Sequence, residues 1–118
     1  MILADTSAWI DHLRRANREL AALLDDGRIV CHPFVEGELI LGGLPDAIAA
    51  LLSIIPLAPQ ATHPEALVFV ERHRLTAAAI GWIDVHLLCS AALGDCRLWT
   101  RDGALRAAAG RIGLAYEP

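Results

Sequence analysis

Four acidic residues of this 118-residue chain lie in apolar surroundings: Asp5, Glu38, Asp84 and Asp102. Asp5 directly follows the apolar run at residues 2–4, and Asp102 closely follows a second apolar run. Glu38 and Asp84 lie in segments with helical periodicity, and their neighbours three and four positions away are uncharged. The chain has no lysine to neutralise such acids if they meet. They therefore predict a site for a hard divalent cation, Mg²⁺ or Mn²⁺, which prefers oxygen ligands.

Each of the four acids also has an ordinary structural explanation. Asp5 and Asp102 both precede helical patterns, and Asp is a favoured N-cap residue. A solvent-exposed helix position explains Glu38, and Glu36 fits the second acidic position nearly as well. Asp84 is the only charged residue of the long apolar helix predicted around it. It therefore needs a cation, hydrogen bonds, or an ion pair with an arginine or a histidine.

The elements that would position these acids alternate between short apolar strands and helices. Strands are predicted at residues 2–4, 29–31, 54–57 and 97–99, with an edge strand at 113–116. Helices, with their capping residues, are predicted at 7–14, 17–24, 33–42, 45–53, 64–74, 76–93 and 102–109. This alternation predicts an α/β fold, a three-layer α/β/α domain over residues 1–118 with a short-stranded parallel sheet. Such folds carry their chemistry at the carboxyl ends of the strands.

Charge and composition narrow the functional classes. The net charge is −4, which argues against a general basic binder of nucleic acids. Without the four acids, ten remaining acids balance ten arginines, so a nucleic-acid substrate is not excluded. Response-regulator receivers and haloacid-dehalogenase-like phosphatases also place an aspartate after the first strand. They typically need a lysine beside the phosphoryl group, and this chain has none.

The chain is apolar for a water-exposed protein, with 55% hydrophobic residues and a mean hydropathy of +0.44. No apolar run approaches the ~18–20 residues of a membrane span, and the N-terminus does not resemble a signal peptide. The high fraction of hydrophobic residues instead predicts a surface buried against a partner. Cys31, Cys89 and Cys96 are odd in number and scattered, which predicts reduced thiols and a cytoplasmic protein. A zinc site built from cysteines and His86 stays open as an alternative.

Four motifs resemble those of PIN-domain ribonucleases. Residues 5–11, Asp-Thr-Ser-Ala-Trp-Ile-Asp, look like the opening signature, and residues 38–42, Glu-Leu-Ile-Leu-Gly, resemble the second acidic motif. Residues 81–84, Gly-Trp-Ile-Asp, are similar to the third motif, and residues 100–102, Thr-Arg-Asp, resemble the fourth. Their order and spacing agree over nearly the whole chain, although residues 43–76 match no fixed pattern. The short length and the first motif point to VapC-type toxins of bacterial toxin–antitoxin pairs.

The resemblance implies an endoribonuclease of PIN fold in which Asp5, Glu38, Asp84 and Asp102 hold one or two Mg²⁺ or Mn²⁺ ions. Thr100 joins them as a site residue whose hydroxyl would contact a phosphate or a metal-bound water. The resemblance also implies a homodimer and a VapB-like antitoxin that inserts a segment near the active site. A PIN-like interaction module that has lost catalysis is the alternative, and the presence of all four acids argues against it.

Arginines near the expected site are candidates for contacts with the RNA backbone. They are Arg14, Arg15, Arg18 and Arg101. A solvated helix face explains each of them equally well, and the sequence alone does not separate the two interpretations. The sequence also does not identify the RNA that would be cleaved.

Overall fold

Three short parallel strands form the centre of the fold. In the computed structural model, which describes residues 1–118, the strands lie side by side in the order β2-β1-β3. The strands are β1 (Ile2–Ala4), β2 (Ile29–Val30) and β3 (Arg97–Trp99). Leu3 in the central strand pairs with Val30 on one side and Leu98 on the other. All three residues of β1 are buried, as expected for a parallel sheet covered on both faces.

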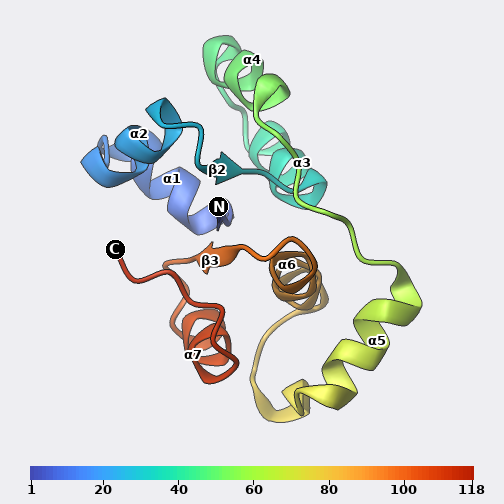
Figure 1. The fold of residues 1–118 in the computed structure, drawn as a ribbon. Helices are drawn as coiled ribbons and strands as arrows, with labels where there is room; N and C mark the ends of the chain where they lie inside the picture. Colours follow the sequence, from blue (N-terminus) through green and yellow to red (C-terminus); the bar gives the residue numbers. More distant parts are fainter.

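Seven α-helices surround this sheet and complete the predicted three-layer α/β/α architecture. Figure 1 shows α2 on one side of the sheet and α6 on the other. The helices are α1 (Thr6–Arg14), α2 (Arg18–Asp25), α3 (Pro33–Leu41), α4 (Asp46–Ile54), α5 (His63–Arg72), α6 (Trp82–Leu93) and α7 (Gly103–Arg111), with a 3₁₀ turn at η1 (Leu75–Ala77). None of these helices is long and apolar enough to cross a membrane.

Polar side chains fix where most helices begin, because the first N–H groups of a helix need an acceptor. Asp5, Asn17 and Asp102 cap α1, α2 and α7, as the sequence predicted. The Nδ1 atom of His32 accepts the Phe34 N–H at 3.0 Å and caps α3, an interaction that the sequence analysis did not anticipate. These caps set the register of the helices that carry the candidate acids.

Two predicted strands are reduced to single bridges at the sheet edges. In the segment 54–57, Ile54 ends α4 and only Leu57 pairs, forming an isolated parallel bridge with Cys31. A strand over 54–57 is therefore wrong, because the helix extends into it and Pro56 has no N–H to donate. The predicted edge strand at 113–116 likewise forms only the bridge between Leu98 and Ala115.

The long helix predicted from residue 76 to residue 93 is also wrong at its start. The chain forms the short turn η1 and then changes direction at Ala79, whose φ of +57° is left-handed. The α6 helix begins only at Trp82, with Gly81 at its N-cap. A left-handed residue cannot continue a right-handed helix, so the apolar pattern before Gly81 was misinterpreted. Seven consecutive residues of α6 from Val85 onward are buried, so α6 is a core helix as predicted.

Candidate active site

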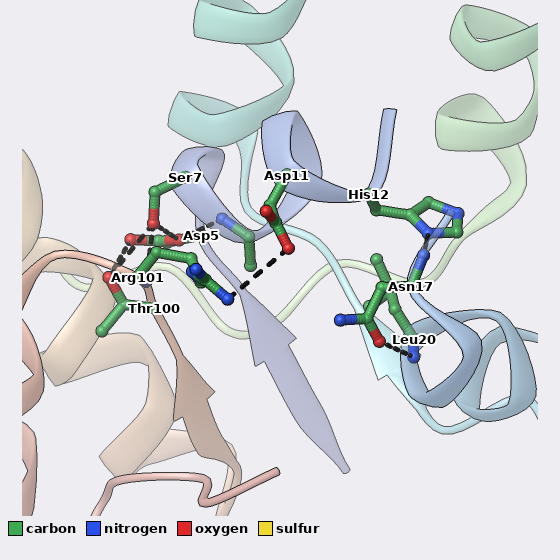
Figure 2. Close-up of polar contacts among 9 residues, drawn as sticks. Asp5, Ser7, Asp11, His12, Asn17, Leu20, Thr100 and Arg101 are labelled. Atoms are coloured by element: carbon green, nitrogen blue, oxygen red, sulfur yellow. Dashed lines mark hydrogen bonds and ion pairs between the residues drawn. The ribbon is translucent and has the colours of Figure 1, made fainter. Parts of the chain in front are cut away.

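Asp5 is buried at the end of β1 and is held from three directions. Its N–H donates to the Trp99 carbonyl at 3.0 Å, which extends the β1–β3 ladder by one bond. Its Oδ1 atom accepts the Ala8 N–H at 2.9 Å and the Ser7 hydroxyl at 2.6 Å. Its Oδ2 atom accepts the Thr100 hydroxyl at 2.5 Å. Figure 2 shows Ser7 and Thr100 meeting Asp5 between α1 and β3. The carboxylate is therefore fixed in position although it is only 5% exposed.

Ser7 and Thr100 join the turn after β1 to the turn after β3. The Ser7 hydroxyl accepts the backbone N–H of Arg101 at 2.8 Å while donating to Asp5. The Thr100 hydroxyl accepts the backbone N–H of Asp102 at 3.0 Å while donating to Asp5. The Thr100 hydrogen is thus directed at Asp5 rather than at open solvent. Ser7 was not among the predicted site residues, although its position two residues after Asp5 was the available signal.

Asp102 lies on the same edge of the sheet but is exposed. Its Oδ1 atom accepts the Leu105 N–H at 3.0 Å and caps α7, so the capping explanation is correct for this residue. The same holds for Asp5 and α1. Capping uses one carboxylate oxygen and leaves the Oδ2 atom of Asp102 without a hydrogen bond. The structural and the metal-binding interpretations are therefore compatible at both positions.

Glu38 and Asp84 are presented by helices and are held more loosely. The exposed Glu38 accepts one hydrogen bond at Oε1, from the Thr6 hydroxyl at 2.9 Å, and this contact favours Glu38 over Glu36 as the site residue. Asp84 lies in the first turn of α6, and its Oδ2 atom accepts the Gly81 N–H at 3.2 Å. Asp84 is half-buried rather than fully surrounded by an apolar helix, because α6 begins later than predicted.

Electrostatic repulsion links all four acids. Burial raises the pKa of Asp84 most strongly, the negative charges of Asp102, Asp5 and Glu38 raise this pKa further, and the Gly81 N–H partly opposes the rise. The ion pairs of the molecule are Arg101–Asp11 and Arg106–Glu117, so no arginine or histidine neutralises any of the four acids. The ion-pair explanation for Asp84 is therefore wrong.

The donor chemistry fits a hard cation, although the side chains do not form a closed cage. No three histidine, cysteine, aspartate or glutamate side chains lie close enough together to make a metal site as they stand. The oxygens Oδ1 of Asp84, Oε2 of Glu38 and Oδ2 of Asp102 have no hydrogen-bond partner. Free carboxylate oxygens beside a fixed Asp5 are the ligands that Mg²⁺ and Mn²⁺ prefer. The residues present therefore fit a divalent ion.

The cysteines and histidines do not form the alternative zinc site. All three cysteines are free and buried, and burial raises the pKa of the Cys31 thiol to about 11. No three cysteine, histidine, aspartate or glutamate side chains lie close enough together to bind zinc as they stand. His32 and His86 instead pack against Phe34, with ring centroids 4.8 and 5.3 Å away, respectively. Their environment is that of an aromatic cluster between α3 and α6.

Comparisons with known proteins identify the family. No family model matches the chain. Ribonuclease VapC32 of Mycobacterium tuberculosis, recorded for strains H37Rv and CDC 1551, is 47% identical, and the match covers 98% of this chain and 95% of the relative. PAE2754 from Pyrobaculum aerophilum has a similar fold, with a TM-score of 0.58 and 16% identity over 91% of this chain and 78% of that one. The chain therefore belongs to the VapC family of PIN-domain ribonucleases.

Proposed function

We propose that this chain is a metal-dependent endoribonuclease, formed by a single PIN domain over residues 1–118, and the toxin of a toxin–antitoxin pair. The observation that carries the proposal is that the charges of Asp102, Asp5 and Glu38 raise the pKa of Asp84, while none of the four acids forms an ion pair. The similarity to Ribonuclease VapC32 of Mycobacterium tuberculosis supports RNA as the substrate. Together, these observations favour phosphodiester hydrolysis at the edge of the sheet.

Asp5, Glu38, Asp84 and Asp102 would hold one or two Mg²⁺ or Mn²⁺ ions. A bound cation supplies charge stabilisation for the attacking water and for the leaving oxygen of the phosphodiester. The fixed carboxylate of Asp5 defines the centre of the site, since its three partners all donate to it. Glu38 and Asp84, presented by α3 and α6, would complete the set of ligands.

Thr100 and Ser7 act by positioning other groups. The Thr100 hydroxyl orients the Oδ2 atom of Asp5 and fixes the backbone before Asp102. The Ser7 hydroxyl orients the Oδ1 atom of Asp5 and fixes the backbone of Arg101. Outer-shell partners of this kind commonly change metal affinity or activity by about 10- to 100-fold when they are removed. We therefore propose that Thr100 positions Asp5 and does not contact a phosphate directly.

An antitoxin and a second copy of this chain are the partners we expect. A groove of about 570 Å³ lies beside Glu38, with Ile10, Leu13, Leu44 and Ile48 among its lining residues. Its apolar lining and its position support docking of a segment from a VapB-like antitoxin. Exposed apolar side chains elsewhere, such as Leu67, Val68 and Leu93, support burial in a homodimer. Three free, buried cysteines agree with a cytoplasmic location.

Cleavage of total cellular RNA by the purified, antitoxin-free protein tests the proposal. We expect discrete products with Mg²⁺ or Mn²⁺, and their loss both in EDTA and in Asp5→Asn. Circular dichroism of Asp5→Asn controls for folding. Metal-independent cleavage, or unchanged cleavage by folded Asp5→Asn, would overturn the assignment of the site. No cleavage of any RNA fraction by folded protein would favour the catalytically silent module instead.

A further inference from the structure

Another pocket, with mostly polar lining residues, lies beside Ser7, a hydrogen-bond partner of Asp5. It has a volume of about 280 Å³ and is lined by Ser7, Ile10, Asp11, Arg14 and Arg101. One lining group touches the candidate active site directly, because the Ser7 hydroxyl hydrogen-bonds both Asp5 and the Arg101 backbone. None of the four proposed metal ligands lines this pocket. The pocket is therefore adjacent to the candidate site but chemically distinct from it.

Two elements bring the arginines of this pocket together. Ser7, Asp11 and Arg14 are spaced four and three residues apart in α1, so they share one helix face. Arg101 reaches Asp11 of this face from the turn after β3, as Figure 2 shows. Arg15 does not line the pocket, although it is adjacent to Arg14 in sequence. The structure therefore separates the arginines that the sequence could not distinguish.

The guanidinium groups in this pocket are available to a ligand. Arg101 makes a single contact with Asp11, from Nη1 to Oδ2 at 3.6 Å, and its side chain is 56% exposed. A long, exposed ion pair of this kind is weak, and Arg101 retains further donors. Arg14 is exposed and forms no ion pair. Two guanidinium groups beside one hydroxylated helix face are suited to an oxyanion, because guanidinium donors match phosphate geometry.

We propose that Arg14 and Arg101 form a subsite for a backbone phosphate of single-stranded RNA that flanks the scissile one. This subsite rests on the proposed nuclease function and specifies where the substrate lies. The acidic cluster and the net charge of −4 repel RNA, so binding needs local positive charge next to the cluster. The two arginines supply this positive charge in a pocket whose lining residue Ser7 is hydrogen-bonded to Asp5. The Asp11 carboxylate holds Arg101 in the free protein and yields it to the phosphate on binding.

The test measures RNA binding separately from cleavage. The probe is a fluorescein-labelled single-stranded RNA of random sequence, bound to full-length Asp5→Asn protein in EDTA over a series of salt concentrations. In this background Arg14→Gln and Arg101→Gln are compared with Arg15→Gln, which removes the same charge one residue outside the pocket. Asp11→Asn forms a fourth variant, with the opposite expected sign.

We expect Arg14→Gln and Arg101→Gln each to weaken binding about tenfold, as for the loss of a charge-assisted hydrogen bond. The slope of log affinity against log salt should fall by up to about 0.7 for the lost phosphate contact. Arg15→Gln should bind within about twofold of its parent, because its charge is solvated. Asp11→Asn should bind more tightly, since it removes an anion and frees Arg101. A purely structural role for the arginines does not predict that gain.

Parallel cleavage assays without the Asp5→Asn change keep the two proposals distinguishable. If metal-dependent cleavage occurs while Arg14→Gln and Arg101→Gln bind RNA like Arg15→Gln, the subsite is overturned and the nuclease stands. If neither cleavage nor RNA binding occurs in folded protein, both proposals are overturned. Support for the subsite also requires that the arginine variants raise KM for a cleaved RNA more than they lower kcat.

Discussion

The two halves of the candidate site are held by different means. In the strand half, Asp5 and Asp102 follow parallel strands, and the hydroxyls of Ser7 and Thr100 interlock the two turns. In the helix half, Glu38 and Asp84 project from α3 and α6, and each accepts a single hydrogen bond. The strand half is therefore preorganised, whereas the helix half can adjust to a ligand.

This difference follows from the electrostatics of a site that collects like charges. Four ionised carboxylates cannot be held in contact by apolar packing alone, because each raises the free energy of the others. One well-fixed carboxylate gives the candidate site its position, and looser partners limit the repulsion among the four acids. In the helix half, burial most strongly and the charges of Asp102, Asp5 and Glu38 in addition raise the pKa of Asp84.

Replacing one acid in each half tests this division with the largest expected effects. Asp5→Asn and Asp84→Asn should each lower cleavage by more than about 100-fold, since even outer-shell partners of a metal cost about 10- to 100-fold. Thermal unfolding in EDTA at pH 7 should distinguish the halves. Asp84→Asn should raise the Tm, because it removes a charge disfavoured by burial and repulsion. Asp5→Asn should raise it less or lower it, because Asp5 accepts three hydrogen bonds.

The pH dependence gives the control for Asp84→Asn. Because the pKa of Asp84 is raised on folding, its ionisation costs stability that grows as pH rises through the unfolded value near 3.8. The advantage of Asp84→Asn should therefore vanish below that pH. Adding Mn²⁺ should raise the Tm of the unmodified protein and have little effect on the variant. Equal Tm values for both proteins at pH 7 in EDTA would contradict a strained helix half.

His32 stabilises the helix half by capping α3, and we expect low pH to weaken this stabilisation. Burial, with a smaller contribution from the nearby His86, lowers the pKa of His32 to about 4. In the unfolded chain His32 binds a proton near pH 6.5, whereas in the folded chain it stays neutral down to about pH 4. Stability is therefore lost as pH falls from about 6.5 towards 4. For this side chain, which is 1% exposed, the loss by pH 4.5 is roughly 2–3 kcal/mol.

Urea unfolding of His32→Asn at pH 7 and pH 4.5 measures this loss. Asparagine is a good N-cap residue and can accept the Phe34 N–H without titrating. The variant should therefore lose less stability than the parent between the two pH values. The effect of carboxylate protonation is the same in both proteins and cancels in the comparison. An identical loss in both proteins would show that His32 does not control the acid sensitivity of the fold.

Two threonines give a matched pair, since each donates a hydrogen bond to an acid of a different half. Thr100→Val leaves the Oδ2 atom of Asp5 and the N–H of Asp102 without their partner. We expect Mn²⁺ affinity or cleavage to fall about 10- to 100-fold. Thr6→Val removes one exposed hydrogen bond to Glu38, and an effect of roughly threefold is expected. Calorimetric titration with Mn²⁺ and single-turnover cleavage would measure both, and an equal effect of the two variants would remove the distinction.

The strand half was the more predictable one from sequence. Asp5 and Asp102 follow apolar runs and act as caps, and both signals are local in the chain. The positions of β1, β2 and β3 along the chain also follow from short apolar segments separated by helices, whereas their order in the sheet was not predicted. The hydrogen bonds from Thr100 to Asp5 and from Arg101 to Ser7 were not predictable, because they join residues more than 90 positions apart.

The helix half was predicted less well because its geometry depends on a break in the chain. Ala79 adopts a left-handed conformation that alanine disfavours, so no residue preference reveals it. The interpretation of Asp84 as a fully buried charge followed from that missed break. The polar pocket of Arg14 and Arg101 also escaped notice, because it needs the relative placement of α1 and the turn after β3.

The same break provides the smallest predicted effect. Ala79 has a φ of +57°, which costs about 1–2 kcal/mol for a residue with a Cβ atom. Ala79→Gly removes that cost but adds about 0.5–1 kcal/mol of backbone entropy, so a net stabilisation of about 0.5–1 kcal/mol is expected. Ala78→Gly is the matched control, since Ala78 has a φ of −79° and should lose stability on the same change. Urea unfolding measures both.

Mn²⁺ affinity decides whether this strain belongs to the site. Ala79 lies between η1 and α6, five residues before Asp84, so its conformation helps to set where α6 begins. If the helix half relies on that fixed start, Ala79→Gly should gain stability yet bind Mn²⁺ a few-fold more weakly, as a looser chain must be ordered on binding. A gain in stability with unchanged Mn²⁺ affinity would show that α6 holds Asp84 without help from the turn at Ala79. The flexibility of the helix half would then lie in α3 and Glu38.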